Sequence, residues 1–335
     1  MIDSENLVDA IYIPLPSALH KDWVDKALEA GKHVLLEKPV ALSTADFESM
    51  VKTAHRCGKL LMDGTMFVHT NRLGRLLEYC RNGEKVGNIQ RIEAAFSFMG
   101  TEDQPDFFET NVRCRKEADP LGCIGDLGWY CVYMALLVFY ATDSARPVKV
   151  RAVDFKCTED GVPIDASCIV YFEKVCVVPS CFKILSQYHQ YLIPLHNAQQ
   201  DLVLSFYCSF QSILRQDITI VGTKKSISLD DFVLPTASPL SFTSKSLSEY
   251  GRFRTFQRDV DTVLVKEEDY QQVLMWKDFA RLSHGVASGK DDMSWQGETA
   301  IEAEEYIQAS LWNQRVMDGL LASVRGEGMP VQISR

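Results

Sequence analysis

The sequence predicts a protein of mixed α/β and α+β class, and two patterns lead to that prediction. Up to about residue 70, short apolar runs alternate with amphipathic helical patterns, which is typical of a parallel sheet with right-handed crossovers. After Pro147, several runs alternate in polarity with a period of two, which indicates a mostly antiparallel, open-faced sheet. The 335 residues are enough for two domains, and we place them at 1–70 and 71–325.

The first part predicts three strands joined by two helices. The buried strands are expected at 8–13, 33–36 and 59–62. Ser17 follows the first strand and is expected to cap the next helix. Ser43 is expected to cap the second helix, with Asp46 three residues later as a weak capping box. The carboxyl ends of such strands form the edge of the sheet at which ligands bind.

The second part predicts one apolar helix among strands, followed by two closing helices. The strands are expected near 92–98, 148–157, 166–173, 201–210, 217–222 and 225–229, and the closing helices near 270–287 and 297–322. The apolar helix spans about 127–140. Its longest apolar run, Trp129–Ala141, is shorter than the ~20 residues that a membrane span needs, so we expect a buried core helix.

Composition and charge exclude several classes of protein. With 46% hydrophobic and 24% charged residues, the chain is neither disordered nor fibrous. The formal net charge of −10 gives no general attraction to nucleic acid, so no nucleic-acid partner is expected. The ten cysteines form no CxxC pair and are expected as reduced core thiols rather than metal ligands. The N-terminus has no basic leader before an apolar core, so we expect a cytoplasmic protein without a membrane partner.

Glu37 and Lys38 directly follow the second predicted strand, at the ligand-binding edge of the sheet. A lysine in that place can polarise a substrate hydroxyl or carbonyl and shift the pKa of a neighbouring acid. The alternative is a solvated charge pair at a strand end, with Pro39 redirecting the chain.

Asp126 and Tyr130 lie four residues apart where a glycine-containing segment enters the apolar helix. That spacing puts a carboxylate and a phenol on one helical face. A phenol becomes a usable general acid or base when a nearby ammonium stabilises its phenolate. The alternative makes Asp126 a helix-start residue and Tyr130 a core ring.

The strand-to-helix turn that contains Leu15 and Pro16 lies at the same sheet edge as Lys38. Free N–H groups at the start of a helix can face an anion or a cofactor ribose. Turn geometry alone also explains the prolines, and His20 is equally a packing residue.

These three segments together resemble the Gfo/Idh/MocA family, named after glucose-fructose oxidoreductase, inositol dehydrogenase and MocA. Pro16–His20 is similar to the family's T-P-N-x-x-H turn, Ala30–Pro39 to its A-G-K-H-V-x-x-E-K-P block, and Gly125–Tyr130 to its D-x-G-x-(H/Y) segment. The resemblance covers nearly the whole chain from residue 5 onward. Residues 63–69 and 95–98 look most like the plant and algal members.

The resemblance implies a dehydrogenase that uses NAD or NADP on a sugar, polyol or trans-dihydrodiol. By carry-over, Lys38 would assist at the reacting oxygen, Tyr130 would transfer the proton, and Asp126 would orient the substrate or Tyr130. The nicotinamide side would be lined by Leu15, Pro16, His20, Glu37 and Lys38. The family's open sheet usually forms a dimer face, so a homodimer is implied. His69 and Asn71 lie near the expected site without an assigned role.

Two departures from the family pattern stand out. No G-x-G-x-x-G motif precedes the first strand, which corresponds to the family's fourth strand, so the first βαβ unit of a Rossmann sheet is expected to be missing. The alternative function is therefore a truncated, non-catalytic oligomerising or ligand-binding protein that cannot hold the cofactor.

The second departure is the segment Val175–Gln200, which separates two runs that would otherwise join as a β-hairpin. It contains one charged residue, Lys183, and no clean hydrophobic period. Its first and last residues can be encoded as GTN and CAG, and we hypothesise a retained intron. The alternative is a genuine loop insertion, such as a substrate lid.

Overall fold

The computed structural model describes residues 8–174, 202–235, 240–248, 257–287 and 297–334. Its helices and strands, in chain order, are β1 (Ala10–Ile13), α1 (His20–Glu29), β2 (His33–Leu36), α2 (Thr44–Cys57), β3 (Leu61–Asp63), α3 (Asn71–Arg81), β4 (Ile89–Met99), α4 (Gly100–Asp103), α5 (Phe107–Thr110), α6 (Trp129–Asp143), β5 (Ala145–Cys157), β6 (Pro163–Lys174), β7 (Leu202–Ser209), β8 (Gln211–Gly222), β9 (Ser226–Leu229), β10 (Leu240–Ser248), β11 (Gln257–Val265), α7 (Gln271–Ala287), α8 (Glu298–Arg325) and β12 (Val331–Gln332).

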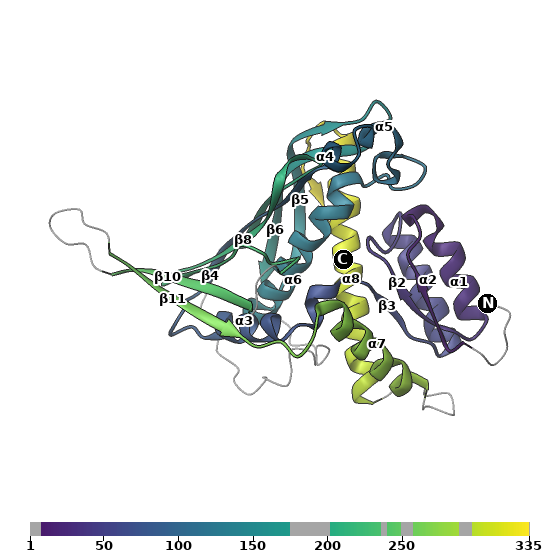
Figure 1. The fold of residues 1–335 in the computed structure, drawn as a ribbon, viewed down its shortest axis with the longest axis horizontal. Helices are drawn as coiled ribbons and strands as arrows, with labels where there is room; N and C mark the ends of the chain where they lie inside the picture. Colours follow the sequence, from purple (N-terminus) through teal and green to yellow (C-terminus); the bar gives the residue numbers. More distant parts are fainter. Residues whose placement is uncertain (1–7, 175–201, 236–239, 249–256, 288–296, 335) are drawn as a thin grey trace.

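The first part is a small parallel sheet in the order β1-β2-β3, with α1 and α2 packed beside it (Figure 1). All four residues of β2 are buried, because a central parallel strand is covered on both faces. Ser43 accepts a hydrogen bond from the Asp46 backbone N–H at 3.2 Å and caps α2 as predicted. The predicted parallel sheet is confirmed for these residues.

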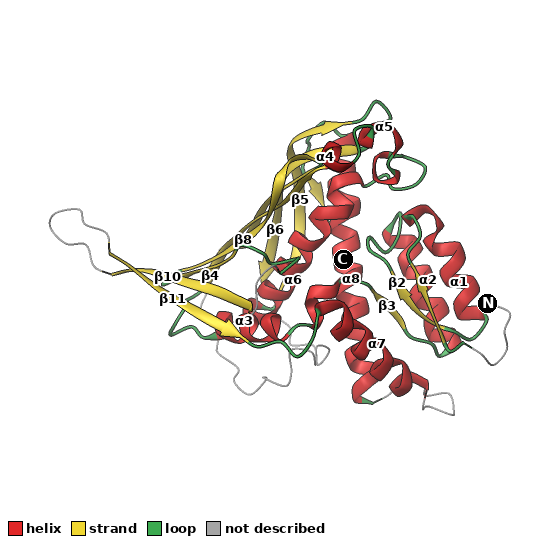
Figure 2. Ribbon diagram, viewed as in Figure 1, coloured by secondary structure: helices red, strands yellow, loops and turns green. Residues whose placement is uncertain are grey.

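The second part is a nine-stranded sheet in the order β11-β10-β9-β8-β4-β7-β6-β5-β12. All its neighbouring strands run antiparallel except β4 and β7, which are parallel. Figure 2 shows α6 and α8 on one side of this sheet. The mixed fold class predicted from the sequence is therefore confirmed.

The predicted hairpin partners flank the 175–200 segment. β6 and β7 pair antiparallel, and Phe172 faces Leu202 at the end of the pairing. The segment itself lies outside the described residues, so the intron hypothesis stays a hypothesis.

Helix α6 is the core of the second part. Every residue from Trp129 to Phe139 is buried, because the sheet packs on one side of the helix and α8 on another. Among the described residues, the helical stretch Ile124–Asp143 has the length and hydropathy of a membrane span, yet 78% of its apolar window is buried in the protein. This stretch is longer than the apolar run Trp129–Ala141 found in the sequence, and it is a buried core helix, as predicted.

Helix α8 holds the two parts together. It packs against β3 and α2 of the small sheet and against α6 and β5 of the large one. Arg315 reaches Glu48 on α2 at 3.1 Å, and Asp318 accepts a hydrogen bond from the Thr44 backbone at 2.7 Å. The domain boundary near residue 70 stays a prediction.

Candidate active site

Two motifs that lie 88 residues apart in sequence meet at the carboxyl ends of the parallel strands. Lys38 follows β2, and its Nζ donates to Asp126 Oδ1 at 2.5 Å and to the Asp126 carbonyl oxygen at 2.8 Å. Both side chains are mostly buried, with exposed fractions of 11% for Lys38 and 15% for Asp126. A buried ion pair with two hydrogen bonds fixes the ammonium in place.

Tyr130 lies beside this pair, one helical turn after Asp126. The Lys38 Nζ is 4.8 Å from the centre of the Tyr130 ring. The ring packs against Phe67 and Phe96 at centroid distances of 6.2 and 5.6 Å, and Tyr130 is 5% exposed. The structure thus brings together Lys38, Asp126 and Tyr130, the three residues with predicted catalytic roles.

The pKa shifts define the protonation states of the cluster. Burial favours the neutral form of both Lys38 and Asp126, but each stabilises the charge of the other. The net result is a raised pKa for Lys38 and a lowered pKa for Asp126, so both are ionised at neutral pH. Burial raises the pKa of Tyr130, and Lys38 only partly offsets it. Tyr130 is therefore protonated at neutral pH and can donate its hydroxyl proton.

Close side-chain packing around position 125 explains the glycine before Asp126. Residues 124–128 form a single π-helical turn, a feature often found at functional sites. A Cβ atom on Gly125 would lie 2.5 Å from the Cβ of Leu121 and 3.2 Å from Cγ of Pro39, which follows a cis peptide bond. The two motifs touch because position 125 has no side chain.

Glu37 lies beside the catalytic cluster but makes its hydrogen bonds to other groups. Its Oε1 accepts a hydrogen bond from the Tyr12 hydroxyl at 2.5 Å, and its Oε2 accepts one from the Lys38 backbone N–H at 3.2 Å. Gly64 gives the carboxylate room, because a Cβ there would lie 3.3 Å from Oε1. The carboxylate buttresses the end of β2 that carries Lys38.

His20 acts on the shape of the turn at Leu15 and Pro16. Its Nε2 lies 2.7 Å from the Leu15 carbonyl oxygen and its Nδ1 lies 3.2 Å from the Val40 carbonyl oxygen. Burial lowers the pKa of His20, so the ring is neutral and the shorter contact carries the proton. The Nε2–H donates to the Leu15 carbonyl oxygen, which makes His20 a brace for this turn.

The prediction that Ser17 caps the following helix was wrong. Ser17 lies in a 3-10 turn, and its hydroxyl and backbone N–H both donate to the Asp119 carboxylate. The Ala18 N–H donates to the Ala118 carbonyl oxygen at 3.0 Å. The sequence had suggested that the N–H groups of this turn are free to face a ligand. These two N–H groups instead donate hydrogen bonds within the protein.

Three residues at the site carried no sequence signal that we used. Tyr12 and Asp119 bind residues far from them in the chain, Glu37 and Ser17. Arg113 donates from its Nε to Asp126 Oδ2 at 3.0 Å. The available signal for Arg113 was the group of three cations, Arg113, Arg115 and Lys116, in an acidic protein.

His69 packs against α7, and Asn71 binds the segment that leads into it. His69 Nδ1 lies 2.9 Å from Asp278 Oδ2, and its ring stacks on Tyr306. The Asn71 backbone N–H donates to Glu267 at 3.0 Å. Among the described residues, no group of three or more His, Cys, Asp or Glu side chains is arranged to hold a metal ion.

The fold and the site together define a class of protein: a Rossmann-type parallel sheet beside an open sheet, with Lys, Asp and Tyr side chains where the two meet. Residues 1–65 match the family described as "Oxidoreductase family, NAD-binding Rossmann fold" and designated GFO_IDH_MocA. The resemblance to the Gfo/Idh/MocA oxidoreductases is therefore confirmed.

Curated relatives agree with this assignment. The chain is 35% identical over 123 residues to a dTDP-3,4-didehydro-2,6-dideoxy-alpha-D-glucose 3-reductase of Saccharopolyspora spinosa, covering 37% of this chain and 35% of that protein. It is 32% identical over 140 residues to a scyllo-inositol 2-dehydrogenase (NADP(+)) of Bacillus subtilis, covering 41% of each. The matched segments thus span 35 to 41% of the length of these two relatives.

Solved structures share the fold. The chain is similar to an inositol dehydrogenase homolog from Azotobacter vinelandii complexed with NAD+, with a TM-score of 0.71 and 14% identity. The match covers 97% of this chain and 78% of that one. At this identity the similarity shows the architecture alone.

Proposed function

We propose that this protein is an NAD(P)-dependent oxidoreductase that transfers a hydride between the nicotinamide and an alcohol or carbonyl of a sugar, polyol or trans-dihydrodiol. The observation that carries the proposal is the buried Lys38–Asp126 ion pair with the Tyr130 ring beside it. The relatives named above, a sugar reductase and an inositol dehydrogenase, support this class of substrate. The alternative of a non-catalytic oligomerising protein has no support from the comparisons.

Each residue of the cluster has a distinct role in the proposed reaction. Tyr130, a phenol at neutral pH, donates the proton to the carbonyl oxygen during reduction and takes it back during alcohol oxidation. The fixed Lys38 ammonium polarises the same oxygen and stabilises negative charge that develops there. Asp126 holds Lys38 in place and keeps it protonated, so it acts through Lys38.

The residues at the sheet edge fit the nicotinamide end of NAD or NADP. Leu15 and Pro16 present a turn that His20 braces, and Glu37 fixes the backbone from which Lys38 projects. When bound, the cofactor supplies the hydride acceptor or donor. The sequence contains no glycine-rich strand-to-helix turn of the dinucleotide fingerprint, which would hold the pyrophosphate. The residues that fit the cofactor are therefore those at its nicotinamide end.

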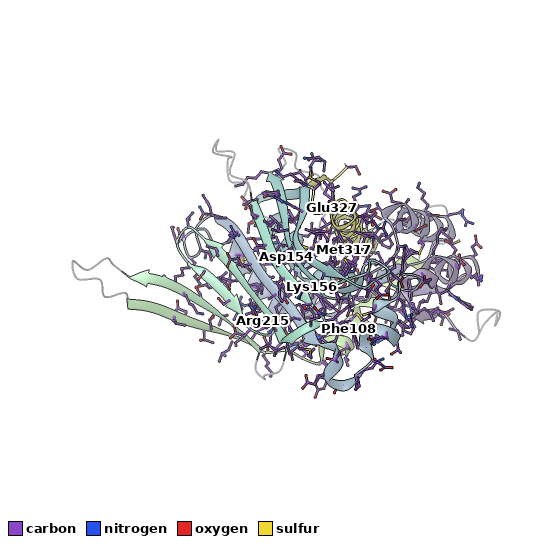
Figure 3. The ribbon with its side chains drawn as sticks, turned by 90° about the horizontal axis from the view of Figure 1, so that it is seen from above. Phe108, Asp154, Lys156, Arg215, Met317 and Glu327 are labelled. Carbon is purple, nitrogen blue, oxygen red and sulfur yellow. The ribbon has the colours of Figure 1, made fainter. Side chains whose placement is uncertain are left out.

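The same proposal includes a cytoplasmic homodimer that takes a small-molecule substrate. The described cysteines are all free thiols, as is usual in a reducing compartment. The face of the large sheet that lies away from α6 and α8 exposes both apolar and charged side chains. Figure 3 labels three of its charged residues, Asp154 and Lys156 on β5 and Arg215 on β8, and Val153 and Ile213 are 48% and 72% exposed. A second copy would cover such a face.

The substitution Tyr130→Phe tests the proposal in the full-length chain. We expect turnover of NAD+ or NADP+ with a panel of sugars, inositols and dihydrodiols to fall by about 100-fold or more, since the group that takes the proton from the alcohol is removed. Cofactor affinity, measured by fluorescence titration, should stay the same. Tyr140→Phe is the control on the same helix, because Tyr140 lies ten residues beyond Tyr130, near the other end of α6 and away from the Lys38–Asp126 pair.

Two results would count against the proposal. Equal turnover of Tyr130→Phe and the wild type would remove Tyr130 from its role. Absence of NADH and NADPH binding by the wild-type chain would exclude the cofactor, and the reaction with it.

A further inference from the structure

Arg113 is a second cation on the Asp126 carboxylate. Lys38 occupies Oδ1 of Asp126, and Arg113 Nε donates to Oδ2 at 3.0 Å. Both carboxylate oxygens therefore accept a hydrogen bond from a cation. A carboxylate held in this way is a bridge between the two cations and is poorly suited to act as a base.

The charges around Tyr130 balance only when Arg113 is included. The charged groups that face the phenol are Lys38, Asp126 and Glu37, and Arg113 acts on it from behind Asp126. Two cations and two carboxylates sum to zero. Without Arg113 the sum is −1, and a negative site opposes the loss of the phenol proton.

Two further groups lie at the edges of this cluster. Tyr12 approaches Tyr130 from β1, and its hydroxyl is bound to Glu37. Asp119 faces both Arg113 and Asp126, and burial raises its pKa. Asp119 acts on Arg113 and Asp126 rather than on Tyr130, and neither group supplies a positive charge, so Arg113 is the second cation of the cluster beside Lys38.

The chain holds Arg113 in position from several sides. Its backbone N–H donates to the Asn111 side chain at 3.1 Å, and Cys114 beside it is buried. Further along the same loop, the Asp119 carboxylate binds Ser17 at the turn after β1. The segment between β4 and the π-helical turn is therefore bound at Asp126 through Arg113 and at the turn after β1 through Asp119.

We propose that Arg113 is a positioning residue that holds the Asp126 carboxylate and neutralises the site around Tyr130, so that the phenol can release its proton. The inference rests on the proposed function of the same site. The Arg113 side chain is 45% exposed and its Asp126 partner 15% exposed, so loss of this ion pair lowers stability by a small but measurable amount. Its removal is therefore expected to affect proton transfer far more than stability.

The first experiment compares Arg113→Gln, Arg113→Lys and the control Arg115→Gln in the full-length chain. Arg115 lies two residues further along the same loop and is exposed. For Arg113→Gln we expect kcat of alcohol oxidation to fall about tenfold or more, and its rise with pH to move to higher pH. Arg113→Lys should recover part of the loss because it keeps the charge, and Arg115→Gln should behave as the wild type.

Three results would overturn the inference. The first is a wild-type pH profile and kcat in Arg113→Gln. The second is a change in KM alone, which would make Arg113 a substrate-binding residue. The third is an equal loss in Arg115→Gln, which would indicate a general effect of charge.

A second measurement does not depend on turnover. The urea midpoints of Arg113→Gln, Asp126→Asn and the double variant form a double-mutant cycle without cofactor or substrate. We expect non-additive midpoints, since both changes break the same contact. Coupling without detectable oxidoreductase activity would leave the Arg113 contact standing and refute the proposed function. Activity with additive midpoints would refute the role of Arg113.

Discussion

His33 should make the stability of the protein depend on pH. It lies on the central strand β2, is 5% exposed, and accepts a hydrogen bond at Nδ1 from the Leu60 backbone N–H at 3.0 Å. Burial, with a smaller effect of Lys59, lowers the pKa of His33 from 6.5 to about 4. The folded protein therefore keeps this ring neutral at a pH where the unfolded chain has already bound a proton.

The sign and size of the effect follow from proton linkage. Below pH 6.5 the unfolded chain binds more protons at this position than the folded chain, so the free energy of unfolding falls as the pH falls. The loss is absent above that pH and complete near the folded pKa of about 4. A shift from 6.5 to about 4 corresponds to about 3 kcal/mol.

Urea unfolding of the wild type and His33→Asn checks this between neutral pH and about pH 4.5. Asparagine offers an oxygen to the Leu60 N–H but does not titrate. Other titrating groups, such as Asp278 and Glu304, are common to both proteins and cancel in the difference. We expect the wild type to lose up to about 3 kcal/mol more than the variant over this range. Parallel pH dependences in the two proteins would refute the reasoning.

Three further predictions concern packing and burial. Gly125→Ala should lower the free energy of unfolding by about 2 kcal/mol and also lower turnover, because the new methyl group overlaps Leu121. Gly74→Ala is the control and should be harmless, because a methyl group there meets no atom within 4 Å. Thermal unfolding and kinetics of both variants check this. Arg72→Met should cost about 3 kcal/mol by urea unfolding, because it leaves the Asp231 carboxylate without its 2.6 Å ion pair; a cost near zero would contradict this. The six buried cysteines among those described should resist a thiol reagent until the protein unfolds, since burial raises their pKa values, and rapid labelling of their peptides in mass spectrometry would argue otherwise.

The sequence predicted those elements whose hydrophobic pattern reflects burial. β6 and β7 have one covered face and alternate regularly, so their pattern identifies them. β10 and β11 escaped prediction because β10 is rich in serine and Phe242 is its one fully buried aromatic side chain. β12 has two residues and is held by backbone pairing with β5, which leaves no pattern in the side chains.

The candidate site was predictable where motifs carried it and unpredictable where tertiary contacts did. Lys38, Asp126 and Tyr130 lie in local patterns, and the structure brings them together. Ser17 follows the local rule for a helix cap, yet its partner is Asp119, 102 residues later in the chain. A short-range rule cannot anticipate a partner that the fold brings in from another element.

The position of Tyr130 relative to Lys38 depends on polar contacts made by its neighbours in the same helix. Trp129 donates from Nε1 to Thr65 Oγ1 at 2.8 Å, and its carbonyl oxygen accepts a hydrogen bond from Asn313 Nδ2 at 3.0 Å. One turn later, the Tyr133 hydroxyl and Ser310 Oγ approach the buried carboxylate of Asp63 at 3.4 and 2.5 Å. These contacts tie the start of α6 to the end of β3 and to α8.

Unlike apolar packing, such contacts have defined directions, and breaking one leaves a buried polar group unpaired. The helix therefore cannot slide along the small sheet without losing several hydrogen bonds at once. This explains how Tyr130, on the helix of one sheet, keeps its place beside Lys38, at the strand end of the other. The buried polar network is the structural reason why the two parts of the protein can share one active site.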